Sequence, residues 1–484
     1  MKVLFVTSEI APFTKTKELA NISYYLPKYL GEKGLDIRVV TPKYRNSNIK
    51  KIQTIGDFGI QFPLKKETCI LKKSKLDKVT VYFIDNYQYF DRDFMYAYDD
   101  DCERFAFFCR AVLEMLKYID FKPDIIHLND WHTAPISMIL NEKYRKEAFY
   151  KDIAVVYTIH DLFCQGICSK GFLKLLGADD DAFDIEKTEY YNMINYMKMG
   201  IVYSDLVTTV SKSYAKEIQT REYGNGLDGV LQTRKDELFG IINGIDYCKF
   251  NPKTDGSLYK NYDYKTYNEK LTNKYFLQDK LKLPKKDVPM IAFVAPFVEE
   301  KGIELLLESI DDICKNDVQL VLLGVGNAVY EYSLKFAMSK YMYQVYAFIG
   351  EDDELLRQIF AASDIFLAPY RVSSYGVNQL IALRYGVIPV ARKIGSLNDI
   401  VVDIQDSPEK GYGYTFEKFS KDDMLASLDK AIKCYEDKDK WGEMAKRTLK
   451  LNLSWEKTAN SYKKIYDKAS KNRKQFCKEV DCSE

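Results

Sequence analysis

The chain has 484 residues, about three times the roughly 150 residues of a typical domain, so it is long enough for two large domains and too long for a small binding module. Its apolar fraction of 46% and charged fraction of 29% are typical of soluble globular proteins and exclude a disordered chain. The 71 Lys and Arg residues balance 70 Asp and Glu residues, and the net charge of +1 argues against electrostatic binding to nucleic acid or to an anionic membrane.

The sequence also argues against membrane, secreted and metal-binding classes. No apolar run approaches the roughly 18 residues that a spanning helix requires. The opening residues, MKVLFVTSEIAPF, contain too short an apolar stretch for the core of a signal peptide. The ten cysteines lack the paired spacing of a zinc site, and we interpret them as reduced thiols. These features predict a cytoplasmic protein with no bound metal.

The first half alternates predicted strands and helices. Lys2–Thr7 is an apolar, β-branched run, typical of a strand buried on both faces of a parallel sheet. The helical apolar period of Glu18–Lys33 ends at Gly34, and Asp36–Thr41 is the next strand. Further strands are predicted at Val79–Ile84, Ile125–Leu128, Ala154–Ile159 and Leu206–Val210, and further helices at Cys102–Tyr118 and Tyr190–Gly200. This order predicts a doubly wound α/β domain.

A domain boundary is predicted near residue 250. Gly, Asn, Pro and Asp cluster in Asn243–Asp255, and a polar stretch continues to about Asn268. A second alternation follows, with strands at Met290–Ala295, Gln319–Leu323, Val345–Ile349, Ile365–Pro369 and Ile388–Ala391 and helices at Gly302–Lys315 and Asp353–Ala362. The stretch from Ser454 to about Arg473 is predicted to be helical. The chain should therefore contain two α/β domains in tandem.

Residues that follow predicted strands are candidates for a site, because ligands bind beyond the carboxyl ends of the strands in open α/β sheets. Ser8 and Glu9 and then Lys15 follow the first strand, Asn129–His132 follow another, and His160 follows Ala154–Ile159. Isolated histidines are more often structural than catalytic, but an imidazole directly after a buried strand is well placed to bind a backbone or sugar group. No histidine spacing matches a pair of metal ligands.

Three positions in the second half are candidates for holding an anion. Gly324 and Gly326 follow a strand, a pattern that fits a phosphate-binding turn or an ordinary turn equally well. Lys301 stands at the start of a predicted helix, where it either holds a phosphate or remains a solvated surface lysine. Tyr375–Gln379 precedes a further helix, whose N–H groups would face the same edge.

Several motifs together resemble the bacterial glycogen synthase and plant starch synthase family. They are MKVLFVTSEIAPF, DIIHLNDWHTAP, TIHDLFCQGI, GIVYSDLVTTVS, YAKEIQTREYGNGLDGVL, GIINGIDY and SWEKTANSY, and they extend from residue 1 to about residue 468. The resemblance implies an α/β GT-B fold, in which two Rossmann-like doubly wound domains face a cleft. It implies an acceptor domain at residues 1–250, a nucleotide-sugar-binding domain at 251–450 and a helix at 451–484 that returns to the first domain.

The family's reaction is retaining transfer of glucose from ADP-glucose to the 4-hydroxyl of an α-1,4-glucan, without a metal or other cofactor. Nine residues occupy positions that resemble the family's sugar-binding and phosphate-binding ones: Glu9, Lys15, Asp130, His160, Gln165, Asn243, Lys301, Gly376 and Gln379. Among them, the resemblance implies catalytic roles for His160, Lys15 and Asp130.

The chain departs from the family pattern at the donor side. The family's Lys-Thr-Gly-Gly-Leu loop reads Lys15-Thr16-Lys17-Glu18-Leu19, followed by Asn21 in place of an Asp. Gly-Arg-Leu reads Ala295-Pro296-Phe297, which removes a guanidinium that binds the diphosphate. Glu-Pro-Cys-Gly reads Ser373-Ser374-Tyr375-Gly376 and Thr-Gly-Gly-Leu reads Ile394-Gly395-Ser396-Leu397, which remove a carboxylate and a hydroxyl.

These departures predict weak or absent activity toward ADP-glucose, since each lost charge stabiliser costs about 3 to 4 kcal/mol in the transition state. Arg371 and Arg392 lie close in sequence and are candidates to compensate. One hypothesis is a weakly active synthase-like glycosyltransferase or a pseudoenzyme. A second is a non-catalytic glucan-binding or regulatory partner of an active glycogen synthase. A third is a GT-B transferase with another nucleotide-sugar donor. An α-1,4-glucan or maltooligosaccharide is the expected ligand in all three.

Overall fold

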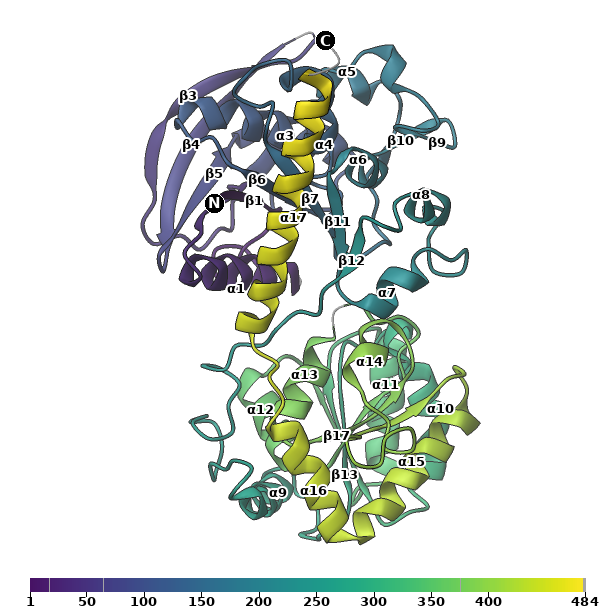
Figure 1. Ribbon diagram of the computed structural model, residues 1–484. Helices are drawn as coiled ribbons and strands as arrows, with labels where there is room; N and C mark the ends of the chain where they lie inside the picture. Colours follow the sequence, from purple (N-terminus) through teal and green to yellow (C-terminus); the bar gives the residue numbers. More distant parts are fainter. Residues whose placement is uncertain (17, 64, 375, 482–484) are drawn as a thin grey trace. The chain divides into compact units, whose positions relative to one another are not determined.

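The computed structural model describes residues 1–16, 18–63, 65–374 and 376–481. The chain forms two compact units. Unit 1 contains Met1–Ile242 together with Trp455–Glu484, and unit 2 contains Asn243–Ser454. Each unit has its own β-sheet with helices packed around it (Figure 1). The chain therefore leaves unit 1 after Ile242 and enters it again at Trp455.

Unit 1 is built on a nine-stranded sheet with the order β12-β11-β7-β6-β1-β2-β5-β4-β3. The strands from β12 to β5 pair in parallel, whereas β4 is antiparallel to both β5 and β3. The bounds are β1 Lys2–Val6, β2 Asp36–Pro42, β3 Gln53–Gln61, β4 Lys66–Leu76, β5 Val79–Asp85, β6 Ile125–Asn129, β7 Ala154–Ile159, β11 Leu206–Thr209 and β12 Leu238–Gly240. Every residue of β6, β7 and β11 is buried, as their continuous apolar runs predict.

Helices cover this sheet. They are α1 Glu18–Glu32, α2 Tyr87–Phe90, α3 Asp101–Tyr118, α4 Pro135–Ile139, α5 Phe172–Leu176, α6 Tyr196–Tyr203, α7 Lys212–Glu217, α8 Asp228–Thr233 and α17 Trp455–Asp481. The apolar residues of α1 recur with the helical period and are buried, which is why this segment packs as a helix. The helix α17, drawn in yellow, packs on α1, β6 and β7 (Figure 1). It extends to Asp481, beyond the predicted end near residue 473.

The predicted helix at Tyr190–Gly200 is wrong in its first half. The segment begins as a hairpin of β9 Glu189–Tyr190 and β10 Met193–Asn195, which joins β8 Ile167–Cys168 in a small sheet ordered β8-β10-β9. Tyr191 and Asn192 have φ values of 49° and 63°, the left-handed conformation of a tight turn, which a helix cannot contain. The helix α6 starts only after Asn195, whose side chain accepts a hydrogen bond from Lys198 N.

Unit 2 is built on a six-stranded parallel sheet with the order β15-β14-β13-β16-β17-β18. The bounds are β13 Met290–Val294, β14 Gln319–Gly324, β15 Val345–Ile349, β16 Ile365–Ala368, β17 Ile388–Arg392 and β18 Tyr414–Phe416. The five strands expected in this half are confirmed to within a residue. The short β18 was not predicted.

The helices of unit 2 are α9 Lys270–Lys280, α10 Ile303–Ile313, α11 Ala328–Lys340, α12 Asp353–Ala362, α13 Val377–Arg384, α14 Gly395–Ile400, α15 Lys421–Glu436 and α16 Lys438–Leu449. The predicted helices before residue 316 and at Asp353–Ala362 are confirmed as α10 and α12. Among the described residues, no helix is both long and apolar enough to cross a membrane.

Candidate functional site

In unit 1, the carboxyl ends of β1, β6 and β7 bring three candidate residues together. The side chain of Asn129 donates from Nδ2 to Val6 O at 2.9 Å, so its Oδ1 accepts from His160 Nε2, also at 2.9 Å. The Asp130 carboxylate accepts a hydrogen bond from the backbone N of His160 at 2.8 Å. The structure therefore brings His160 and Asp130 together, as their places after neighbouring strands predict, and it identifies Asn129 as the residue that orients the imidazole.

Asp130 adopts a strained backbone conformation. Its φ is 56°, in the left-handed region, and its side chain is buried. A residue other than glycine in this region costs about 1 to 3 kcal/mol and persists only where the surroundings impose it. Aspartate adopts this region more readily than most residues, and the turn brings the Asp130 carboxylate to the backbone N of His160.

His160 is uncharged at neutral pH. Burial lowers the pKa of its imidazole to about 3, so the ring acts as a neutral hydrogen-bonding group and not as a cationic acid. Burial also lowers the pKa of His127 well below its usual value. His127 contacts Tyr466 Oη at 2.7 Å and Thr158 Oγ1 at 2.6 Å inside the core. His127 is therefore structural, while His160 lies at the strand edge.

Glu9 shapes the loop that carries Lys15. Its buried carboxylate accepts hydrogen bonds from the backbone N of Thr16 at 2.7 Å and from Thr16 Oγ1 at 3.0 Å. Lys15 next to it is exposed. The departures at Glu18 and Asn21 contact one another, since Asn21 Nδ2 donates to Glu18 Oε2 at 3.1 Å. Lys17 lies outside the described residues.

The side-chain amides of Gln165 and Asn243 differ in how many hydrogen-bond partners they have. Gln165 Nε2 donates to Leu162 O and Asn225 O, and its Oε1 accepts from Asn195 Nδ2 at 2.6 Å. This amide holds two loops together and has little hydrogen-bonding capacity left for a ligand. Asn243 is 3% exposed, and its Nδ2 has no hydrogen-bond partner among the residues that the structure describes. It is the first residue of unit 2.

In unit 2, Lys301 lies beside the end of β16. Its Nζ is 4.8 Å from the centre of the Tyr370 ring. The neighbouring Gly302 has a φ of 68°, and a Cβ at this position would be 2.0 Å from Pro369 O. Only glycine fits here. The start of α10 is therefore held against the strand end where the Lys301 ammonium stands.

Ser373, Gly376, Gln379 and Ser396 form a compact polar cluster. The hydroxyls of Ser373 and Ser396 are 3.0 Å apart, and Gln379 Nε2 is 3.5 Å from Ser373 Oγ. Gly376 has a φ of 69°, and a Cβ there would be 2.5 Å from Ser396 Oγ. The cluster contains no charged side chain. Tyr375 lies outside the described residues.

Gly324, the last residue of β14, and Gly326 after it allow close packing of the backbone. A Cβ on Gly324 would be 2.0 Å from Ala295 O, and one on Gly326 would be 2.1 Å from Phe297 O. Both glycines allow this loop to approach the segment after β13, which favours the ordinary turn over a phosphate-binding one. Pro296 in that segment has no N–H to offer.

The two arginines near this edge already have partners. Arg371 Nε pairs with Glu304 Oε1 at 2.7 Å, and its guanidinium lies 4.0 Å from the Phe419 ring centre. Arg392 donates to the backbone oxygens of Glu417 and Arg371, each at 3.0 Å. Across the described part of the chain, no group of three or more His, Cys, Asp or Glu residues could hold a metal ion.

The chain is similar to known proteins over nearly its full length. Residues 2–233 match the family model for the starch synthase catalytic domain, and residues 276–448 match that for glycosyl transferases group 1. A glycogen synthase of Clostridium novyi is 44% identical over 96% of this chain and 98% of its own, and one of Moorella thermoacetica is 40% identical over 98% of each.

Solved structures show the same likeness. The catalytic domain of starch synthase IV from Arabidopsis thaliana, bound to ADP and acarbose, has a TM-score of 0.88 and 29% identity, covering 97% of this chain and 99% of that one. A sucrose-phosphate synthase from Thermosynechococcus elongatus, with a TM-score of 0.61 and 14% identity over 96% of this chain and 98% of its own, shares the fold alone. The architecture is GT-B, with two Rossmann-like α/β domains.

Proposed function

The chain belongs to the glycogen synthase and starch synthase family of glycosyltransferases, and from this we propose that it transfers glucose, with retention, from ADP-glucose to the 4-hydroxyl end of an α-1,4-glucan. The observation that carries the proposal is the joined arrangement of Asp130, Asn129 and His160 at the strand edge of a chain that matches glycogen synthases over nearly its full length. The comparisons do not favour a regulatory partner or another nucleotide-sugar donor.

The proposal assigns a role to each group. Unit 1 holds the glucan and unit 2 holds the nucleotide sugar. His160 and Asp130 orient the glucose that is transferred, and the neutral His160 ring contributes hydrogen bonds that are stronger in the transition state than in the ground state. Glu9 positions the Lys15 loop of unit 1, and Lys301 of unit 2 supplies positive charge to the diphosphate as it leaves.

We further propose that turnover is limited by weak binding of the donor. The cluster of Ser373, Gln379 and Ser396 is neutral, Pro296 offers neither a guanidinium nor an N–H, and Arg371 is paired with Glu304. An anionic diphosphate is therefore met by few cations. A cytoplasmic location is part of the same proposal.

Separate isothermal titrations with ADP-glucose and with maltooligosaccharide test this proposal, together with an assay of radiolabelled glucose transfer. We expect measurable transfer, tighter binding of maltooligosaccharide and weak binding of ADP-glucose. A dissociation constant for ADP-glucose in the low micromolar range would contradict weak binding of the donor. Such a constant corresponds to a binding free energy of about −8 kcal/mol. The absence of any glucose transfer at saturating concentrations of both ligands would contradict the proposed reaction.

A further inference from the structure

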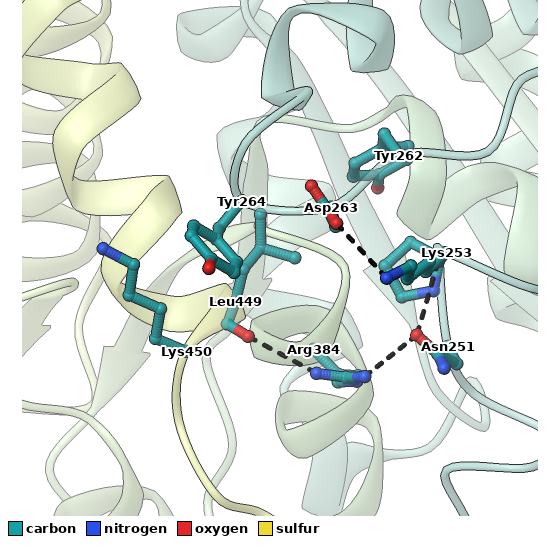
Figure 2. A pocket seen from close by; sticks show the side chains of 9 residues that line it. Asn251, Lys253, Tyr262, Asp263, Tyr264, Arg384, Leu449 and Lys450 are labelled. Atoms are coloured by element: carbon teal, nitrogen blue, oxygen red, sulfur yellow. Dashed lines mark hydrogen bonds and ion pairs between the residues drawn. The ribbon is translucent and has the colours of Figure 1, made fainter.

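Unit 2 contains a cavity of about 400 Å³ that lies apart from the proposed donor residues. Its walls come from the segment Asn251–Tyr264 and from the ends of α13 and α16 (Figure 2). Arg384, the last residue of α13, lines it, whereas Gly376 of the donor cluster precedes the first residue of that helix. The cavity is thus at the opposite end of α13 from the donor cluster.

The side chains around the cavity carry an excess of positive charge. Lys253, Arg384 and Lys450 line it together with a single carboxylate, Asp263. Asp263 Oδ1 accepts hydrogen bonds from the backbone N of Lys265 at 2.8 Å and of Thr266 at 3.2 Å, and these bonds lower the pKa of its carboxyl. Its Oδ2 is 3.8 Å from Lys253 Nζ. One carboxylate thus faces three cations.

The polar groups at the cavity are mainly hydrogen-bond donors. Asn251 Oδ1 already accepts from Arg384 Nη2 at 2.9 Å and from the backbone N of Lys253 at 3.3 Å. The amide NH₂ of Asn251 is therefore its group left for a ligand, beside the lysine and arginine donors. Tyr264, 39% exposed, adds an aromatic wall, and Lys450 Nζ lies 5.0 Å from its ring centre. A ligand that fits such a site is rich in acceptors and anionic.

Contacts with Tyr247 and Leu449 hold the arginine in place. The guanidinium of Arg384 lies 4.1 Å from the Tyr247 ring centre and donates from Nη1 to Leu449 O at 3.3 Å. Its Nε has no hydrogen-bond partner within the described ranges. Tyr247 is itself fixed, because its hydroxyl donates to Leu451 O at 3.0 Å and accepts from Leu453 N at 2.8 Å. The planar donor group is thus preorganised, which reduces the entropy lost on binding an oxyanion.

We propose that this cavity binds the phosphate group of a small molecule, either inorganic phosphate or a sugar phosphomonoester. Lys253 and Lys450 supply the charge, and Arg384 and the Asn251 amide supply directed donors to the phosphate oxygens. In a phosphomonoester, the sugar would lie along the Tyr264 ring. This site is separate from the transfer reaction proposed above and does not depend on it.

Titration calorimetry on the full chain at constant ionic strength, with chloride as the balancing anion, tests the site. The probes are inorganic phosphate, glucose 1-phosphate and, as the neutral control, glucose. We expect both phosphate compounds to bind to the unaltered chain. The double variant Lys253→Gln with Lys450→Gln should bind each of them at least tenfold more weakly. Tighter binding of glucose 1-phosphate than of phosphate would identify the phosphomonoester as the ligand, and equal binding would identify inorganic phosphate.

A control variant makes the result specific. Lys285→Gln with Lys335→Gln removes the same charge from exposed positions of unit 2 that do not line the cavity, and it should leave phosphate binding unchanged. The proposal is overturned if the unaltered chain does not bind phosphate, or if the Lys253 and Lys450 double variant binds it as tightly as the unaltered chain.

Discussion

His160 and His127 are both buried and both uncharged at neutral pH, yet they serve different purposes. His127 is enclosed between Tyr466 and Thr158 in the core of unit 1. His160 lies at the end of β7, where Asn129 and Asp130 hold its ring and its backbone. Burial penalises the imidazolium in each case. At the residue scale, the hydrogen-bond partners of a buried histidine show whether its ring is structural or belongs to the candidate site.

The depressed pKa of His160 predicts a pH dependence of stability. Its value is about 3 in the folded chain and about 6.5 when unfolded. As the pH falls from 6.5 to 3, the unfolded chain binds a proton that the folded chain does not. The free energy of unfolding should therefore fall by up to about 1.4 kcal/mol per pH unit for this group.

Replacing His160 by Gln should make the free energy of unfolding fall less steeply below pH 6.5. The difference corresponds to one proton, because glutamine does not titrate. Urea unfolding followed by circular dichroism at a series of pH values between 7 and 4 would measure it. The same slope in the variant and in the unaltered chain would show that His160 titrates normally in the folded state.

The double substitution Pro296→Arg with Ser373→Glu tests whether these two residues weaken the donor side. Together they restore the guanidinium and the carboxylate that the family pattern has at these positions, so glucose transfer should rise by about a hundredfold or more. Radiolabelled transfer by this variant would be compared with that of Pro296→Ala with Ser373→Ala, which should stay low. Tight binding of ADP-glucose without transfer would locate the remaining block in the loop at residues 15–19.

At the scale of elements, the loops between strands and helices decide which residues can stand at the site. Periodic patterns predicted most strands and several helices, because side-chain alternation is a local property. The same patterns failed at β9 and β10, where a turn at Tyr191 and Asn192 interrupts a run that looks helical. They also missed β3 and β4 at the edge of the sheet, whose exposed and charged positions weaken the alternation of apolar residues.

Gly302 offers a test of one such loop. Its φ of 68° and the Cβ position 2.0 Å from Pro369 O predict that Gly302→Ala will destabilise unit 2. The backbone strain alone should cost about 1 to 3 kcal/mol. Calorimetry of the thermal unfolding of the full chain would measure this loss.

Gly229→Ala is the matched control for this substitution. Gly229 lies in α8, and a Cβ there has no atom within 4 Å. Alanine is favoured over glycine within a helix by about 0.5 to 1 kcal/mol. Alanine at this position should therefore leave the melting temperature unchanged or raise it. If both alanine variants melt at the temperature of the unaltered chain, Gly302 does not have the left-handed backbone described here.

At the scale of the whole molecule, residues from both ends of the chain build unit 1. Trp455, Tyr462 and Tyr466 of α17 are buried, and α17 packs on α1, β6 and β7. Tyr466 is 339 positions from His127, which it contacts at 2.7 Å. The last helix is therefore part of the core of the first domain.

Tyr466→Phe tests this connection without removing the helix. The substitution leaves a buried nitrogen of His127 without its partner, so the stability of unit 1 should fall by about 1 to 3 kcal/mol. Thermal unfolding would measure the change. Tyr332→Phe, on a side chain that is 73% exposed, should have no effect. Equal melting temperatures for the two variants would show that the Tyr466 hydroxyl contributes nothing to the fold.

The sequence alone determined the two α/β domains, most of their strands and the membership of the family, because apolar periodicity and contiguous motifs are local features of a chain. Tertiary structure alone decided which polar groups meet. In the folded chain, His160 is hydrogen-bonded to Asn129, Ser373 to Ser396, and the Gln165 amide to Asn195. Folding also places Lys253, Arg384 and Lys450 around one cavity. The partners of a buried donor or acceptor depend on which strand ends and helix ends pack together, and no local pattern contains that information.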